Sequence, residues 1–475
     1  MRVDLLAALA GYLLLLLIVG VFFARKTRSL EGFFLASRNL GSLLVFVSLA
    51  ASWIGASSTL VTVDEAYSQG VSSFCVMGLP AVLTALGFAF VFAAPIRRLP
   101  ILTLPDLVEL RYSRTVRHLA SFLIVWYMIL LAASQMVALG SFLGAILRIP
   151  YVQALFLGTA VVVVYSVAGG FFSVVLTDCL QFVLLVGGIF GLFFYLLGHV
   201  SFGDAAAAAL HARGPGFWEF FHGWERNALV VLSFVCAWTI SPIVWQRIQA
   251  ARTPRHAQRG LLAAALAFLL IYAVIVAIGI LALPLLPENE LDGPLLSVVV
   301  SSVGALLSGF LFVAVAAAVM STLDTAINTG ALSLTRDVLQ RLLRRTSDAD
   351  ALIMSRGSTV VIAALALLIA TRLQSILQAL GLASEILAEG FFIPGVAMLF
   401  LRRRLPTAGL LSVCLGGGYA VCVFFAAAGL LSLPLPDWPY SVPYGLGLSL
   451  AGFLLGMAWD LSHTAPALRP EVDDI

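Results

Sequence analysis

The feature that most constrains this chain is a series of thirteen apolar runs, each about long enough to cross a lipid bilayer as a helix, which takes about 20 mostly apolar residues. These runs occupy residues 4–24, 41–62, 71–96, 118–146, 151–168, 174–198, 228–246, 260–285, 296–334, 357–371, 377–401, 408–431 and 440–459. Only 11% of the 475 residues are charged, against roughly 25% in a soluble domain. The chain therefore cannot cover a water-facing surface. The sequence predicts an all-α integral membrane protein and excludes a soluble enzyme or a nucleic-acid binder.

The basic residues indicate how these spans are oriented. If the N-terminus lies outside, the inner segments carry 22 of the 27 Arg and Lys residues, and the outer segments carry Arg2, Arg148, Arg213, Arg226 and Arg372. Cytoplasmic loops are enriched in Arg and Lys. The distribution predicts thirteen spans, with the N-terminus outside and the C-terminus inside. We expect a multi-pass protein of the cell membrane, in the inner membrane if the source is a bacterium, without an obligate protein partner.

Two spans contain residues that interrupt a helix. The second carries small and hydroxylated residues around Gly55, and the seventh contains Pro242, which has no backbone N–H to donate. Because they lie five spans apart, spans two to six and seven to eleven form two units that each begin with a broken helix. Matched interruptions of this kind indicate the midplane site of a transporter. Close helix packing is the alternative explanation for each one.

Four acidic residues lie within the predicted spans: Asp178, Asp324, Glu385 and Glu389. No Arg or Lys lies well inside a span, so we expect these acids to bind a proton or a metal cation. Three hydroxyl residues lie within about one turn of Asp324, and hard oxygens suit a hard cation. A protonated core acid is the alternative for each aspartate. Glu385 and Glu389 share one helix face near the outer end of their span, where a solvated vestibule and a substrate contact both remain open.

Several motifs make the chain resemble the sodium:solute symporters, a family that includes sodium/proline, sodium/galactose, sialic acid, pantothenate and choline carriers. These are Gly-Gly…Thr-Asp-x-x-Gln at 169–181, Ala-x-x-Ser-Thr at 318–322, Thr-Leu-Pro-Asp-Leu…Arg-Tyr at 103–112, and Gln246-Arg247. The resemblance covers nearly the whole chain. It implies a single transmembrane domain over 1–475 with the five-plus-five inverted repeat of the leucine-transporter type. The extra first helix would be 4–24, the repeats 41–198 and 228–402, and the two extra C-terminal helices 408–459.

The resemblance also implies the residues that bind sodium. The family's shared site uses backbone carbonyls and two hydroxyls, and the matching positions here are Ala51, Ile54, Ala318, Ser321 and Thr322. Some members bind a second sodium beside the aspartate of the Thr-Asp motif. This implies a second sodium or proton site at Asp178, Asp324 and Thr325. Asp324 stands where some relatives have serine, and its extra charge favours a cation.

The substrate residues that the resemblance implies lie beside the broken helices and on the fourth span: Trp53, Ser57, Ser58, Gln135 and Trp238. Trp53 departs from the polar residues of the proline and sugar carriers. It is more similar to the choline carrier, in which aromatic rings surround a quaternary ammonium. Apolar packing is the alternative for each tryptophan.

Together these observations predict a secondary active symporter, not an enzyme, that uses sodium ions to import a small organic solute by alternating access. With four acids and no base in the core spans, a cationic or zwitterionic solute is favoured over a plain anion. The alternatives are an uncoupled or proton-coupled carrier of the same fold, and a membrane sensor.

Overall fold

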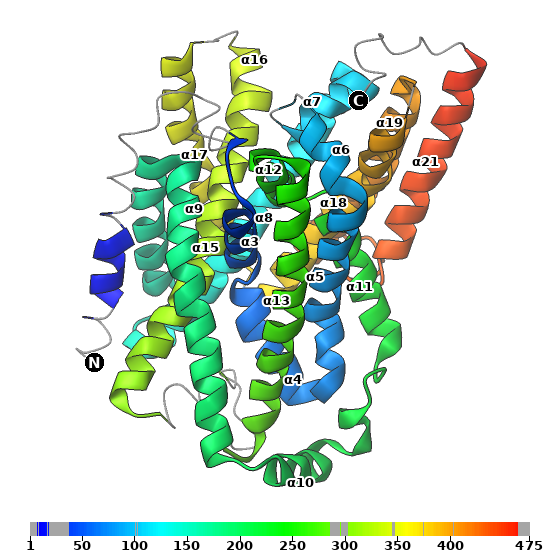
Figure 1. Cartoon of the computed structure of the whole chain (residues 1–475). Coiled ribbons are helices and arrows are strands. Elements are labelled where there is room, and N and C mark those ends of the chain that lie inside the picture. Colours follow the sequence, from blue (N-terminus) through cyan, green and yellow to red (C-terminus); the bar gives the residue numbers. More distant parts are fainter. Residues whose placement is uncertain are drawn as a thin grey trace.

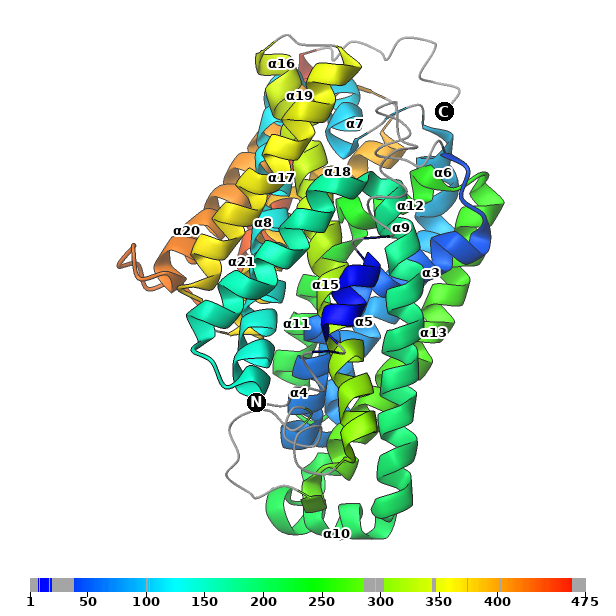
Figure 2. The same ribbon diagram turned by 90° about the vertical axis from the view of Figure 1, so that its left-hand side faces the viewer.

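The computed structural model describes residues 7, 9–16, 18, 38–99, 101, 103–285, 295, 303–343, 347–373, 375–401 and 403–463. Every regular element within these residues is a helix, and no β-strand is assigned among them. An all-helical structure follows from the long apolar runs, because hydrocarbon offers no partner for backbone N–H and C=O groups and a helix satisfies them internally. Figures 1 and 2 show an elongated bundle, with α10 lying across one end and α7, α16 and α19 near the other.

The helices are given in chain order, with short 3-10 and π-helical segments labelled η. They are α3 (Ser42–Trp53), η2 (Ser57–Val61), α4 (Thr62–Gln69), η3 (Gly70–Ser73), α5 (Phe74–Gly87), η4 (Phe88–Phe92), α6 (Ala93–Arg98), α7 (Leu104–Arg111), α8 (Arg114–Leu147), α9 (Tyr151–His199), α10 (Phe202–Arg213), η5 (Pro215–Trp218), α11 (Trp224–Thr239), α12 (Pro242–Ala250), α13 (Pro254–Leu281), η6 (Leu283–Leu285), α15 (Ala305–Ser333), η7 (Leu334–Leu339), α16 (Gln340–Leu342), α17 (Asp348–Ala370), α18 (Ile376–Phe400), α19 (Pro406–Ser412), η8 (Val413–Gly417), α20 (Gly418–Ala427) and α21 (Val442–Ser462).

Helices occupy every predicted span from residue 41 onward. Nine helical segments of the described residues are long and apolar enough to cross a membrane, or ten if the bent pair α11 and α12 is one span. Two shorter apolar helices, Ser42–Trp53 and Tyr151–Val164, fall in further predicted spans. Most of the first predicted span, 4–24, lies outside the described residues. The total of thirteen spans and their orientation therefore stay predictions.

The fifth and sixth predicted spans belong to one helix, α9, of 49 residues. A straight helix of that length would measure about 74 Å, more than twice the hydrocarbon thickness of about 30 Å. Figure 2 shows α9 rising along one side of the bundle and then turning back along another. Its two apolar stretches, Tyr151–Val164 and Val174–His199, can therefore each cross the membrane as predicted.

Side-chain caps define where several long helices begin. The hydroxyls of Ser113, Thr253, Ser347 and Ser375 each accept a hydrogen bond from the backbone N–H three residues later. These bonds satisfy one of the N–H groups that a helix N-terminus leaves without a partner. The polar residues between the apolar runs therefore start the spans at defined positions.

Both predicted interruptions are present as broken helices. Helix α3 ends at Trp53, and Ile54 has a non-helical backbone (φ −87°, ψ 77°) before helical structure resumes at Ala56. A Cβ atom at Gly55 would collide with Thr322 Oγ1 and lie 2.7 Å from Gln135 Oε1, so only glycine fits there without movement of these groups. The second break separates α11 from α12, which meet at 43°.

Helix α15 forms the centre of the bundle. It packs against α8, α9, α17 and α3. The most apolar part of the span Leu307–Leu342, which contains α15, is 94% buried, whereas the corresponding part of Val174–His199 is 28% buried. Because α12 also contacts both α3 and α15, the two broken helices meet beside this central helix.

Candidate functional site

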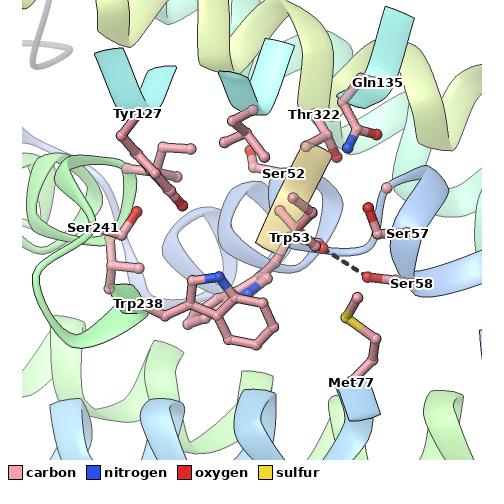
Figure 3. Close-up of a pocket in the computed structure, with 15 residues that line it drawn as sticks. Ser52, Trp53, Ser57, Ser58, Met77, Tyr127, Gln135, Trp238, Ser241 and Thr322 are labelled. Carbon is pink, nitrogen blue, oxygen red and sulfur yellow. Dashed lines mark hydrogen bonds between the residues drawn. The ribbon is translucent and has the colours of Figure 1, made fainter. Parts of the chain in front are cut away.

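A cavity lies where the two helix breaks face α8 and α15, and Figure 3 shows the side chains that surround it. Its volume is about 40 Å³, well below the roughly 300–1,000 Å³ typical of small-ligand sites, so the lining side chains would have to move apart to admit a solute. None of its lining side chains is charged. They are Ser52, Trp53, Gly55, Ser57, Ser58, Met77, Tyr127, Leu131, Gln135, Trp238, Ser241, Ile243, Val244, Thr322 and Leu380.

The structure brings all five predicted substrate residues to this cavity, on α3, η2, α8 and α11. Gln135 Oε1 accepts a hydrogen bond from Ala56 N at 2.9 Å and so ties α8 to the first helix break. Ser58 Oγ donates to the Trp53 carbonyl at 3.0 Å and accepts from Tyr272 OH at 2.6 Å. The buried Ser57 hydroxyl has no hydrogen-bond partner among the described residues, so it is available to a ligand.

Aromatic rings form one wall of the cavity. The Trp53 ring stands edge-on to Trp238 and to Phe268, with ring centroids 5.3 Å apart in both pairs. Trp238 stacks on Phe234 with centroids 4.9 Å apart. These contacts fix the two tryptophans in place, and both side chains also line the cavity (Figure 3). Trp53 and Trp238 therefore pack against other aromatic rings and also line the cavity.

The residues of the predicted shared sodium site lie beside this cavity, where the first helix break meets α15. Ser321 Oγ donates to the carbonyl oxygens of Ala51 at 2.8 Å and Ala318 at 2.9 Å. Thr322 Oγ1 lies 3.4 Å from the Ala318 carbonyl and also lines the cavity. Ile54, at the break itself, is fully buried. This group of neutral oxygens fits a hard monovalent cation.

The expectation that no base lies near the buried acids is wrong. Arg247 is completely buried, and its Nη2 lies 3.5 Å from Asp178 Oδ2. The same Nη2 donates to Ser52 Oγ at 2.5 Å and to Thr325 Oγ1 at 3.1 Å. Asp178 also accepts from Ser48 Oγ at 2.7 Å. The predicted second cation site, with Asp324 buried close by, thus contains the guanidinium of Arg247.

Arg247 lies in the core because of the position of the second helix break. The apolar run 228–246 places Arg247 at the end of a span, but helix α12 restarts at Pro242 and continues to Ala250. Arg247 therefore lies in the middle of a buried helix rather than in a loop. The Gln246-Arg247 motif draws attention to Arg247 in the sequence, but the ion pair of Arg247 with Asp178 depends on tertiary packing.

The suggestion of a solvated vestibule at Glu385 and Glu389 is also wrong. Both lie within α18 and are fully buried. Glu385 accepts a hydrogen bond from Ser441 Oγ, and a Cβ atom on Gly445 of α21 would collide with the Glu389 carboxylate. Neither glutamate is among the residues that line the cavity.

Comparisons with known proteins bear on the family and the fold of the chain. The profile of the sodium:solute symporter family matches residues 33–417. The osmoregulated proline transporter OpuE of Bacillus subtilis (strain 168) is 23% identical over 477 residues, covering 96% of this chain and 95% of that protein. The sodium/glucose cotransporter of Vibrio parahaemolyticus is 25% identical over 473 residues, covering 90% and 86%. A solved structure of a Na⁺-coupled sialic acid symporter in a substrate-bound outward-open state shares the fold, with a TM-score of 0.80 at 19% identity over 98% of both chains.

Proposed function

This chain belongs to the sodium:solute symporter family, and on that premise we propose that it imports a small organic solute by sodium-coupled alternating access. Its function is membrane transport rather than catalysis, as a multi-pass protein of the cell membrane. What we propose beyond family membership is the alternating-access mechanism, the residues that bind sodium and the chemical class of the solute. We also propose the thirteen spans and the two inverted repeats, which the two matched helix breaks support.

The observation that carries this proposal is that Thr322 belongs to both sites and lies against Gly55 at the helix break. Thr322 is one of the proposed sodium ligands and lines the cavity, and a Cβ atom at Gly55 would meet its hydroxyl. A sodium ion held between Ala51, Ile54, Ala318, Ser321 and Thr322 would therefore fix the helix break that positions Trp53, Ser57 and Ser58. Sodium and solute would then each favour the state that binds the other, which is the requirement for coupling.

The membrane potential supplies enough energy for such a carrier. One elementary charge that moves through 100 mV releases about 2.3 kcal/mol, which corresponds to roughly a fifty-fold solute gradient per sodium ion. The sodium concentration gradient adds to this value.

We propose that the solute is cationic or zwitterionic. The faces of Trp53 and Trp238 can attract an ammonium group by up to about 2 kcal/mol when desolvated. A carboxylate of a zwitterion could bind the N-terminus that begins at Ala56, because helix N-termini carry partial positive charge. Arg247 weakens the earlier argument from the absence of a base. However, it does not line the cavity, and its guanidinium contacts Asp178, Ser52 and Thr325.

Asp178, Asp324 and Thr325 remain the proposed second sodium or proton site. In the arrangement described here the Arg247 guanidinium contacts Asp178 and Thr325 directly. A second cation would therefore have to compete with Arg247.

Uptake into proteoliposomes tests this function. Radiolabelled proline, choline, glucose, pantothenate and sialic acid are offered with an inward gradient of sodium, of protons or of potassium. We expect uptake of at least one solute with the sodium gradient alone, and competition mainly by amines and amino acids. Equal uptake in all three gradients would contradict sodium coupling. If a monocarboxylate or sialic acid competes best while amines and amino acids do nothing, the proposed solute class is wrong.

A further inference from the structure

Two glutamates that the transport site does not use are buried together on α18. Glu385 and Glu389 are four residues apart, so their side chains lie on the same face of the helix. Both are fully buried, near the middle of a helix that packs against α21, η8 and α20. These three segments belong to the C-terminal region 408–459, outside the two proposed repeats.

Glycines of the neighbouring helices enclose Glu389. A Cβ atom on Gly445 of α21 would collide with its carboxylate, and one on Gly416 of η8 would collide with its backbone carbonyl. The helices therefore approach this position as closely as their backbones allow. A hydrated ion would not fit between Gly445 and the carboxylate, whereas a proton requires no additional volume.

The oxygens of the pair are largely without hydrogen bonds. Glu385 Oε1 accepts from Ser441 Oγ, but Glu385 Oε2 and both carboxylate oxygens of Glu389 have no partner within the described part of the chain. An unpaired carboxylate costs several kcal/mol in an apolar environment, and a second one beside it adds repulsion. Two ionised glutamates are therefore not a stable state of this packing.

The titratable groups that face the pair cannot neutralise it. They are Asp437, which precedes α21, and Tyr419 on α20. Each of these is neutral or negative, and no Arg, Lys or His of the described residues forms an ion pair with either glutamate. Among the residues that the structure describes, none therefore supplies a positive charge to the pair.

We propose that Glu385 and Glu389 form a proton-binding site that joins α18 to α21 and is separate from the solute cavity. In the packed arrangement the pair holds at least one proton. Loss of protons would place repelling charges against Gly445 and favour separation of α21 from α18. The site goes beyond the proposed sodium coupling and does not depend on it, because it uses neither the solute residues nor the proposed sodium ligands.

Infrared spectroscopy of the purified full-length protein in detergent tests the proposal, because a protonated carboxyl group has a C=O stretching band distinct from that of a carboxylate. At neutral pH we expect this band in the wild type, its loss or reduction in Glu385→Gln and Glu389→Gln, and its retention in Glu225→Gln, which alters an exposed glutamate. If both glutamine variants keep the full wild-type band, the glutamates are ionised and the proposal is wrong.

Two further measurements keep the test decisive. Wild-type protein with ¹³C-carboxyl glutamate needs no substitution in the core, so it works even if the variants fail to fold. The band should shift with this label, and an unshifted band would contradict the proposal. Replacing N-methylglucamine by sodium at constant pH and ionic strength should leave the band unchanged. Its loss on addition of sodium would identify a sodium site instead.

Discussion

Replacing Arg247 by methionine should strongly destabilise the protein, because it leaves the Asp178 carboxylate buried without its cation. The two charged atoms are 3.5 Å apart, and both side chains are at most 1% exposed. With an effective dielectric constant of about 20, Coulomb's law gives about 5 kcal/mol for this separation. Removal of one member of a buried pair typically costs about 3–5 kcal/mol. We expect each of Arg247→Met and Asp178→Asn to lose stability in this range.

The double variant Asp178→Asn/Arg247→Met separates the pair interaction from the cost of each substitution. The double variant has no unpaired buried charge and so avoids its desolvation cost. Its loss of unfolding free energy should therefore be clearly smaller than the sum of the losses of the two single variants. The assay is denaturant unfolding of the purified proteins in detergent, with potassium chloride instead of sodium chloride.

The pair Glu65–Arg226 offers a matched control. Its atoms lie 3.3 Å apart, but the side chains are 13% and 31% exposed. Partly solvated pairs contribute about 1 kcal/mol or less. If the coupling energy of Asp178 with Arg247 is no larger than that of this control pair, the assignment of a strong buried ion pair is refuted.

The same variants test the second sodium site. In Arg247→Met the Asp178 carboxylate and the Ser52 and Thr325 hydroxyls remain, and a sodium ion could replace the guanidinium. Binding at 100 times the dissociation constant stabilises a protein by about 2.7 kcal/mol. Sodium should therefore raise the stability of Arg247→Met more than that of the wild type. An equal gain in both proteins would argue against a cation site at Asp178.

Two further substitutions test the helix break. Thr322→Ala should raise the sodium concentration for half-maximal uptake about tenfold or more, because one oxygen contact to a charged group is worth about 1.5–3 kcal/mol. The control Thr359→Ala removes a hydroxyl that donates a hydrogen bond within α17 and should leave this concentration unchanged. An unaltered sodium dependence in Thr322→Ala would exclude Thr322 from the sodium site. Gly55→Ala should reduce uptake by about a hundredfold, because displacement of binding groups by about 1 Å has effects of that size. The control Gly87→Ala should transport normally, because its Cβ atom would meet nothing within 4 Å. Normal uptake by Gly55→Ala would show that the close approach of Gly55 to Thr322 is not required.

The parts of the fold that could be predicted from sequence are those set by local chemistry. Each apolar run must form a helix because its backbone has no other partner in a membrane. The breaks at Gly55 and Pro242 also follow from the residues themselves. The cavity residues Trp53 and Trp238 were found through the family resemblance. Their distance from each other depends on how two helices far apart in the sequence pack.

The acidic residues show why the rest could not be predicted. Asp178 and Arg247 are 69 residues apart, and Glu385 and Ser441 are 56 residues apart. An average of hydrophobicity along the chain treats an arginine as the end of a span, although a bent helix can carry it into the core. Similarly, the position of Glu385 and Glu389 on one helix face does not reveal whether that face meets water or another helix.

The charges in the core give the two proposed sites, one for sodium and one for sodium or a proton, a different character. A transported ion must bind strongly enough to enter a site and weakly enough to leave it. The proposed sodium ligands around Ser321 and Thr322 carry no formal charge, so a sodium ion bound there would not be held by a carboxylate. Asp178 would by itself hold sodium much more strongly. A guanidinium tethered beside it competes for the same oxygens and lowers its affinity for a free cation, so Arg247 would allow an ion bound at Asp178 to be released during transport.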